Sequence, residues 1–340
     1  MKKYNTIILG SGVGGLGSGC WLKEMKKDFV IIEKLNETPM NLHNGVHYLH
    51  SVPKLPFQAD LKEITLTDGV LTKEGSIRHY PELQDALEYS EKVRAIQHPS
   101  SIYEVGTKHS VWIPKSNSMN DYIKEMVKFI GLKSFMLNSE IVSIDLNEKI
   151  ITLNRYGKEE KLKYENLIST IPLRAFIEMS KSVQFIDVEF KSTPIEITNF
   201  KVNKIVPNWL INIYVPSKEV KPYRMSILNN NASIESIDKI DIPDFGVVKE
   251  LFKMFHIDIS DHKEYTWWQG KIISLDFDTR ERILNYFIPL NVFFIGRFGV
   301  WNNKLLMDST INQASEVCKY ISIEKKHEFD TKQLIKELSK

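Results

Sequence analysis

The sequence predicts an α/β protein, and three observations carry this prediction. A strand–helix–strand pattern with a glycine-rich first turn occupies residues 4–34. An apolar run at 166–172 has the composition of a buried strand that returns to the same sheet. A second apolar run at 292–295 stops at a glycine and precedes a helix-compatible stretch. Apolar strands that alternate with helical patterns are typical of the α/β class.

The first strand runs from Tyr4 to Leu9, and the glycine-rich turn follows it directly. In a dinucleotide-binding turn the first glycine allows the tight turn, the second lets the backbone approach a pyrophosphate, and the third lets helix and strand pack closely. The helix expected at 20–27 would direct its free N–H groups and positive end at the phosphates. The three matching positions and the two residues between them are Gly10, Gly12, Gly15, Val13 and Gly14.

The second strand, at 29–32, closes on Glu33, and Lys34 follows it. Glu33 lies 18 positions after Gly15, near the spacing of about 20 at which an acidic residue binds the ribose hydroxyls. An acidic residue here, in place of an arginine, argues against NADP, but it leaves FAD and NAD open. The alternative is a glycine-rich turn in an α/β protein that binds no dinucleotide.

Composition excludes several classes of protein. The 340 residues carry a formal net charge of +2 with scattered lysines, so they show no nucleic-acid-binding signature. No stretch approaches the ~18 apolar residues of a membrane span, and no signal peptide is recognisable. Cys20 and Cys318 fall in expected helices, which predicts reduced, buried thiols in a cytoplasmic protein.

Three histidines lie within eight residues, at His43, His47 and His50. Their spacing matches no zinc frame and no cysteine or carboxylate cluster accompanies them, so we expect no metal site. Two interpretations stay open for this segment. It is either a loop with satisfied histidines or a loop that lies against a cofactor ring.

Local patterns predict the elements in between. Alternating or apolar runs predict strands at 55–70, 101–105, 109–113, 140–145, 150–154, 161–164, 195–215 and 223–227. Helical spacing predicts helices at 81–95, 121–130, 245–255 and 280–287, and residues 229–242 are expected to be irregular. Arg224 is a lone cation in an apolar strand, a costly place for charge unless it faces an anionic substrate or an internal acidic partner.

The strand at 292–295 would direct Gly296 and Arg297 to the carboxyl edge of the sheet, where dinucleotides bind. Arg297 can then neutralise a pyrophosphate. The alternative is that Arg297 forms a surface salt bridge and Trp301 is a core aromatic residue. A helix follows at 310–323, and Asp308 or Ser309 suits its N-cap.

Four segments resemble those of an FAD-dependent superfamily that includes amine oxidases, protoporphyrinogen oxidases, phytoene desaturases and UDP-galactopyranose mutase. They are the N-terminal turn with Glu33, the Gly-x-His-x-x-His segment at 45–50, the strand at 167–172, and the segment 295–301 followed by Met307 and Asp308. The last segment is similar to the superfamily's C-terminal flavin motif. After Arg224 the chain departs from the mutases, since residues 225–230 lack their Glu and His-Phe pair.

The resemblance implies a Rossmann-type FAD-binding domain that is assembled from separated segments, with a mixed α+β substrate domain inserted between them. The FAD-binding segments would be 1–52, 136–175 and 288–325. The substrate domain would comprise 53–135 and 176–287, and 326–340 would form a C-terminal tail.

The resemblance also implies roles for particular residues. His47 would lie beside the isoalloxazine ring, and the helix that opens at Met307 and Asp308 would direct its positive end at the pyrimidine edge of the flavin. Arg224 and Arg280 would bind substrate, with His47 and Arg224 in the catalytic centre. The further cofactor contacts would be Gly45, Val142, Thr170 and Gly296.

The function that follows is an FAD-dependent oxidoreductase, which transfers hydride from a small organic substrate, an amine or an anion, to flavin N5. One alternative is a redox-neutral nucleotide-sugar mutase, in which Arg224 and Arg280 hold a diphosphate. The other is a protein that binds FAD without turnover. The sequence leaves a homodimer open.

Overall fold

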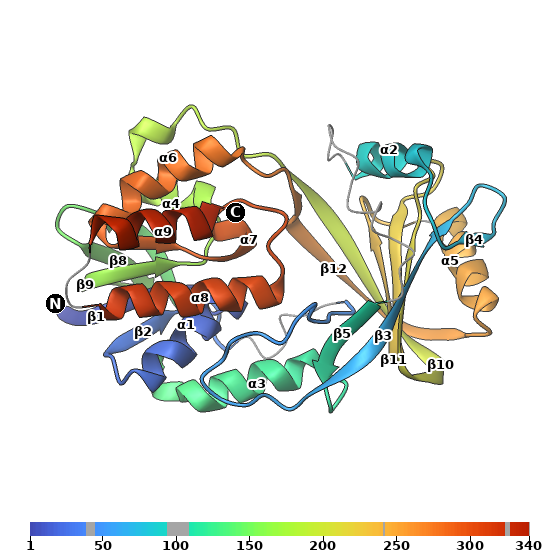
Figure 1. The fold of residues 1–340 in the computed structure, drawn as a ribbon, viewed down its shortest axis with the longest axis horizontal. Helices are drawn as coiled ribbons and strands as arrows, with labels where there is room; N and C mark the ends of the chain where they lie inside the picture. Colours follow the sequence, from blue (N-terminus) through green and yellow to red (C-terminus); the bar gives the residue numbers. More distant parts are fainter. Residues whose placement is uncertain (39–44, 94–108, 241, 324–326, 340) are drawn as a thin grey trace.

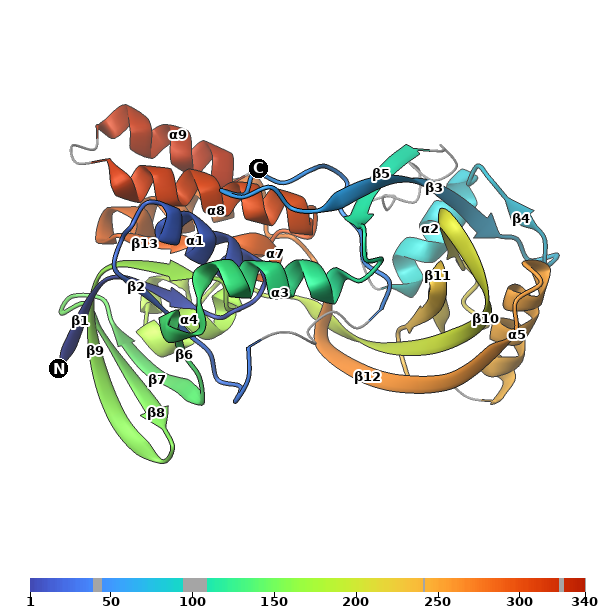
Figure 2. The ribbon, with the colours of Figure 1, turned by 90° about the horizontal axis from the view of Figure 1, so that it is seen from below.

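The computed structural model describes residues 1–38, 45–93, 109–240, 242–323 and 327–339 (Figure 1). The strand predicted at 101–105 and the first histidine of the predicted loop, His43, lie outside these residues. Within the described ranges the strands form two sheets, one of seven strands and one of six. The predicted α/β class is confirmed, since helices pack on strands of both sheets (Figures 1 and 2).

The first sheet is built on two parallel neighbours, β1 (Lys2–Leu9) and β9 (Lys158–Ser169). Ile7 pairs with Leu167, so the apolar run predicted to return to the first sheet does so. The carboxyl ends of the parallel strands meet at one edge, which brings together segments far apart in the sequence. The other members are β2 (Phe29–Ile32), β6 (Phe135–Met136), β7 (Ser139–Asp145), β8 (Ile150–Arg155) and β13 (Val292–Phe294).

Amphipathic helices cover this sheet because each buries an apolar face. α1 (Val13–Glu24) packs against both α3 (Met119–Ile130) and α8 (Met307–Ser322). α6 (Phe277–Phe287) packs against α9 (Glu328–Ser339), and α4 (Leu173–Ser180) follows β9. One apolar core includes residues of all these helices. The packing thus assigns α3, α6 and α9 to the first core, although the sequence analysis places them in the substrate domain or the tail.

The second sheet is organised by β10 (Ser192–Tyr214), a 23-residue strand that crosses the right-hand part of Figure 1. β10 pairs antiparallel with β11 (Pro222–Ser236) and β12 (Ile259–Ile272), and parallel with β3 (Leu61–Leu71). Two helices bury apolar side chains against it, α2 (Leu83–Lys92) and α5 (Ile242–Met254). Two short strands extend the sheet from β3, namely β4 (Ile77–Arg78) and β5 (His109–Pro114).

Three local expectations are corrected. Residues 229–236, expected to be irregular, continue β11, because pairing with β10 gives their backbone groups partners that local sequence does not reveal. The strand β12 was not predicted at all. α8 begins at Met307, so neither Asp308 nor Ser309 is its N-cap. Instead the N–H of Leu306 donates to the hydroxyl of Ser309 over 2.8 Å.

Three further observations concern the described residues. Cys20 and Cys318 are free and buried, as predicted. Among the described residues, no group of three or more His, Cys, Asp or Glu side chains is placed to hold a metal ion. The described helices include none that combines the length and the apolar character needed to cross a membrane.

Candidate functional site

The glycine-rich turn leaves open space at the start of α1. A Cβ atom added to Gly12 would have no heavy atom within 4 Å, although Gly12 lies between a buried strand and a buried helix. Gly14 differs, since its Cβ would lie 3.1–3.2 Å from Thr310, Ile295 and Thr170. The turn therefore lies where β1, β9, β13 and α8 converge, and it has room on one side for a ligand.

Glu33 lies at the tip of β2, beside this turn. One oxygen of its carboxylate accepts hydrogen bonds from the N–H of Ser11 at 3.1 Å and from its hydroxyl at 2.5 Å. The other oxygen accepts the N–H of Leu35 at 3.0 Å. The next residue, Lys34, is exposed. Val142 is 53% exposed at a bulge in β7, the strand whose first N–H donates to the Glu33 carbonyl.

The C-terminal segment closes the same edge of the sheet. The N–H and hydroxyl of Thr170 both donate to the carbonyl of Leu9, at 3.0 and 2.8 Å. Gly296 has a φ of +82°, and its N–H donates to the side-chain oxygen of Gln313 at 3.0 Å. The amide nitrogen of Gln313 is buried without a hydrogen-bond partner among the described residues. Thr170 and Gly296 therefore hold the ends of β9 and β13 beside the glycine-rich turn.

Residues 45–51 connect the second sheet to the start of α8. The N–H of Val46 donates to the hydroxyl of Ser233 on β11 at 3.1 Å. At the other end, the hydroxyl of Ser51 donates to one oxygen of Asp308 at 2.6 Å, and the second oxygen of Asp308 is buried without a partner among the described residues. Met307 and His47 are half-buried, and Gly45 has a φ of +98°. His47 therefore lies between the two sheets, on a segment tied at both ends.

A charged cluster lies on the second sheet. Arg224 of β11 forms an ion pair with Glu235 of the same strand, and the hydroxyl of Tyr223 donates to the other carboxylate oxygen at 2.5 Å. The side chains of Arg224 and Glu235 are 23% and 9% exposed, so the pair is largely, but not fully, withdrawn from solvent. Glu235 is thus the internal acidic partner that the sequence analysis left open for Arg224.

Lys271, near the end of β12, is the second cation of the cluster. It lies opposite Thr193 of β10, and the preceding Gly270 allows a close approach, since a Cβ there would lie 2.2 Å from Ile195. The ammonium of Lys271 stands 4.7 Å from the ring centroid of Tyr223. The ring whose hydroxyl holds Glu235 therefore also carries a cation on its face.

Arg297 approaches the cluster from the first sheet. It lies in α7 (Gly296–Gly299), and its Nε donates to the carbonyl of Leu305 at 3.1 Å. The turn after α7 is bonded to the end of β12, because the N–H of Leu275 donates to the Trp301 carbonyl at 3.1 Å and the N–H of Asn303 donates to the Ser274 hydroxyl at 2.8 Å. Trp301 itself is 1% exposed and belongs to the first core.

Electrostatic coupling follows from this proximity. Burial lowers the pKa of Lys271, Glu235 raises it, and the charges of Arg224 and Arg297 lower it further, to about 8. Burial also lowers the pKa of Arg297, and Arg224 adds to this effect. Burial raises the pKa of Glu235, but Arg224, Lys271 and the hydrogen bond from Tyr223 outweigh it and bring the pKa to about 2. These four side chains act as one charged unit.

Polar groups from three further segments border this unit. Asn212 of β10 donates to the hydroxyl of Tyr48 at 3.1 Å, and it pairs in register with the buried Asp68 of β3. Burial raises the pKa of Tyr48, while the charge of Arg224 lowers it and that of Asp68 raises it. Tyr48 follows His47 directly, so the 45–51 segment borders the charged unit.

Arg280 lies elsewhere. Its Nε donates to the carbonyl of Ser339 in α9 at 2.9 Å, and its Nη1 donates to the carbonyl of Leu275. The guanidinium therefore ties α6 to the C-terminal helix. The substrate role predicted for Arg280 has no support in these contacts.

Comparison with known proteins identifies the fold. No protein-family model matches the chain, and no curated protein matches it in sequence. The crystal structure of reduced UDP-galactopyranose mutase superimposes with a TM-score of 0.72 at 13% identity, covering 99% of each chain. The chain has a UDP-galactopyranose-mutase-like fold.

Two other structures share this mutase-like fold. One is a protein from Exiguobacterium sp. 255-15 proposed to be a protoporphyrinogen oxidase, with a TM-score of 0.61 at 9% identity over 95% of this chain and 99% of that one. The other is the rebeccamycin biosynthetic enzyme RebC with reduced flavin, with a TM-score of 0.53 at 11% identity over 94% of this chain and 61% of that one. The predicted resemblance is confirmed for the fold.

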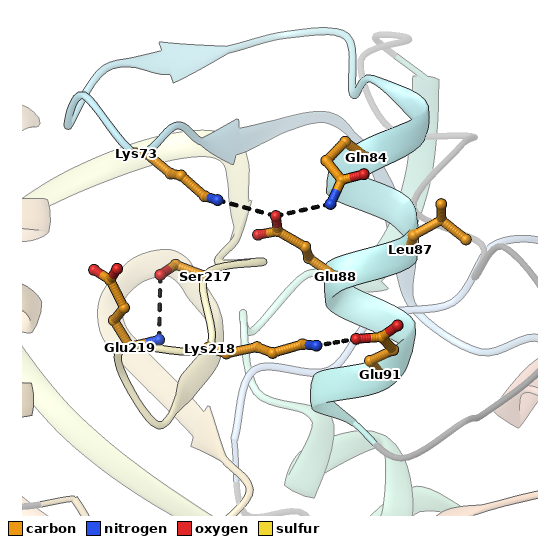
Figure 3. Close-up of a pocket in the computed structure, with 8 residues that line it drawn as sticks. All are labelled: Lys73, Gln84, Leu87, Glu88, Glu91, Ser217, Lys218 and Glu219. Atoms are coloured by element: carbon orange, nitrogen blue, oxygen red, sulfur yellow. Dashed lines mark hydrogen bonds and ion pairs between the residues drawn. The ribbon is translucent and has the colours of Figure 1, made fainter.

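A pocket of about 310 Å³ lies away from the charged cluster, between α2 and residues 217–219 (Figure 3). Glu88 accepts hydrogen bonds from Lys73 and from Gln84, each at 3.0 Å, and Lys218 pairs with Glu91. Both lysines of this pocket are paired with its glutamates, so neither is a pre-arranged binding group for an incoming anion.

Sequence reasoning missed two members of the cluster in the mutase-like fold, Glu235 and Lys271. Glu235 fell in a region expected to be irregular, and Lys271 ends a strand that was not predicted. One signal pointed to the first of them, because a lone Arg224 in an apolar strand requires an acidic partner. No local signal marks Lys271, since its place depends on pairing with β10.

Proposed function

We propose that the protein is an FAD-dependent oxidoreductase. The observation that carries this proposal is the open space above Gly12, at the N-terminal end of α1 and at the carboxyl edge of a parallel sheet. Dinucleotides bind at this place in folds of this kind. The mutase-like fold and the reduced flavin in the RebC structure support FAD as the dinucleotide.

The residues present fit FAD. Gly12 leaves room for the pyrophosphate beside the free N–H groups of α1, and the carboxylate of Glu33 can exchange the hydroxyl of Ser11 for those of a ribose. Val142, which is exposed, would contact the adenine end. At the far end, the start of α8 at Met307 and Asp308 would stabilise negative charge on the flavin ring. The further predicted contacts would be Val13, Gly14, Lys34, Gly45, Thr170 and Gly296.

FAD would supply the acceptor for a hydride from a C–H bond next to nitrogen or oxygen. The chain's own residues would bind and orient the substrate. His47 would lie against the flavin, because its segment is tied to Asp308 at one end and to Ser233 at the other. Arg224, in its pair with Glu235, would form the charged wall of the substrate site.

The alternative reaction is the isomerisation of a nucleotide sugar by a mutase, and the mutase-like fold supports it. It requires two cations that hold a diphosphate, and Arg224 and Arg280 were the candidates. Arg280 donates to two backbone carbonyls and Arg224 is paired with Glu235, and these contacts do not favour a diphosphate clamp. We therefore favour the oxidoreductase. Buried, free cysteines support the predicted cytoplasmic location.

The absorption spectrum of the purified protein tests the cofactor. We expect the two visible bands of oxidised flavin, either as purified or after FAD is added and the excess removed. Anaerobic bleaching by a panel of amines and hydroxy acids then tests the oxidoreductase, and incubation with UDP-galactose under dithionite tests the mutase. Absence of flavin bands after FAD addition would refute the proposal.

A further inference from the structure

Where the two sheets meet, which we call the junction, cationic side chains outnumber carboxylates. Arg224, Lys271 and Arg297 are coupled to one another and to a single carboxylate, Glu235. Asp68, which acts on Tyr48 together with Arg224, adds a second carboxylate at the border. This set therefore contains three cations and two carboxylates, with one positive charge in excess.

The charges in this set are not equally engaged. Arg224 and Glu235 form a direct ion pair, and the hydroxyl of Tyr223 donates a hydrogen bond to the second oxygen of the carboxylate. Lys271 forms no ion pair among the described residues, and its one direct interaction there is with the face of Tyr223 at 4.7 Å. The ammonium of Lys271 is half-buried, and its charged neighbours are two guanidinium groups and a carboxylate that is already paired. Burying such a charge costs free energy unless an anion pairs with it.

Backbone packing fixes this ammonium at the junction. Gly270 lets β12 approach β10 closely enough for Lys271 to lie opposite Thr193. A few residues later the same chain is bonded to the turn that follows Arg297, through Leu275 and Trp301. Lys271 therefore lies near the end of the strand that leads from the second sheet to the edge where the flavin is proposed to bind.

We propose that Lys271, with Arg297 beside it and the Arg224–Glu235 pair behind it, binds a carboxylate group of the substrate, so that the substrate is a small organic acid. This deepens the proposed function and rests on it for the redox step, but binding of the acid does not require flavin. The excess of one positive charge favours a carboxylate. A phosphate dianion or a diphosphate would leave uncompensated negative charge in a partly buried site.

Matched ligands test this proposal on the full chain as purified. Isothermal titration at pH 7 and constant ionic strength would compare benzoate with its neutral counterpart benzamide, and with inorganic phosphate. We expect benzoate to bind at least about tenfold more tightly than benzamide, since the two differ mainly in charge. Phosphate is expected to bind more weakly than benzoate. Equal affinities for benzoate and benzamide, or tighter binding of phosphate, would overturn the carboxylate assignment.

Variants assign the binding to the residue. Lys271→Met should reduce benzoate affinity by about tenfold or more and leave benzamide unchanged, while Lys271→Arg, which keeps the charge, should retain most of the preference. Lys263→Met is the matched control, since Lys263 is an exposed lysine of the same strand, and it should bind benzoate like the wild type. Unchanged benzoate affinity in a folded Lys271→Met protein would refute the role of Lys271.

Flavin content, measured separately, keeps the two proposals distinguishable. Benzoate binding that depends on Lys271 in a protein without affinity for FAD would remove the oxidoreductase and leave the acid site. Flavin bands together with equal benzoate and benzamide affinities would remove the acid site and leave the oxidoreductase.

Discussion

The carbonyl oxygen of Gly10 lies 2.0 Å from the position that a β-carbon on residue 15 would occupy. The backbone of α1 thus crosses the turn at a distance that only glycine permits. Gly12, two residues into the same turn, has nothing within 4 Å of the equivalent position. The turn therefore contains one glycine required by packing and one whose missing side chain leaves space.

Substitution at Gly12 should separate ligand binding from folding. Gly12 has φ −64° and ψ −178°, an extended conformation that any residue adopts, so Gly12→Val should leave the melting temperature and the circular dichroism spectrum close to those of the wild type. The valine side chain would fill the space proposed for the pyrophosphate, and flavin retention should be lost. The ratio of flavin to protein absorbance measures this. Wild-type flavin content in Gly12→Val would contradict the proposed site.

Substitution at Gly15 should do the reverse and act on stability. Gly15→Ala forces α1 away from the turn and should cost about 1–3 kcal/mol of unfolding free energy. Gly246→Ala is the control, because Gly246 lies in helix α5 with open space around it, and it should gain about 0.5–1 kcal/mol. Denaturant titration measures both. Equal stabilities of the two variants would show that the close approach at Gly15 does not matter.

Lys92 offers a test of the second core. Its buried ammonium donates to the carbonyls of Val215, Ser217 and Pro222 at 2.9, 2.6 and 2.6 Å, and so fastens α2 to the turn between β10 and β11. Lys92→Met would leave buried acceptors without a donor, and we expect a loss of about 2–5 kcal/mol in unfolding free energy.

Lys73→Met is the matched control for Lys92. Lys73 pairs with Glu88 at the surface, and its side chain is 66% exposed (Figure 3). Its replacement should change stability by roughly 0–1 kcal/mol. If both variants unfold at the same denaturant concentration, the three carbonyl contacts of Lys92 contribute nothing measurable.

The pKa of Lys271 predicts how stability depends on pH. It is about 8 in the folded protein and 10.5 ordinarily, so between these values the unfolded chain binds a proton that the folded chain has released. The free energy of unfolding contributed by this residue therefore rises with pH across that window. Relative to Lys271→Met, the wild type should gain stability from pH 8 to 10.5. A constant difference between the two would show that Lys271 titrates normally.

The same titration should affect binding of organic acids. The groups that face Lys271 are Arg224, Glu235, Tyr223 and Arg297. Since Lys271 binds a carboxylate only in its charged form, benzoate affinity should fall as pH rises above about 8. A bound acid opposes this by raising the pKa of Lys271, so the fall should begin at a higher pH when benzoate is saturating. Titration at several pH values measures both effects.

The sequence predicted those parts of the fold and site that depend on neighbours along the chain. The glycine turn, the strand closing on Glu33 and the apolar strand at 292–295 are all marked by local pattern, and the structure places them at one edge of a sheet. Lys271 and Glu235 could not be found this way, because β12 and the second half of β11 are rich in polar residues and are recognised as strands only through their pairing with β10. The contact of Arg280 with α9 could not be predicted either, since Ser339 is distant from it in sequence.

The pairing of β9 has a consequence for how the chain is made. Leu167 pairs with Ile7 on one side and with Val292 on the other, so the first sheet joins the beginning, middle and last part of the chain. Contacts this distant slow folding, because long loops must close before the contacts form. During synthesis β9 can pair with β1 and β8 early, but the part of its edge at 167–169 stays open until Val292 has left the ribosome. A chain that stops before that point presents an apolar strand edge to its neighbours, which is a template for aggregation.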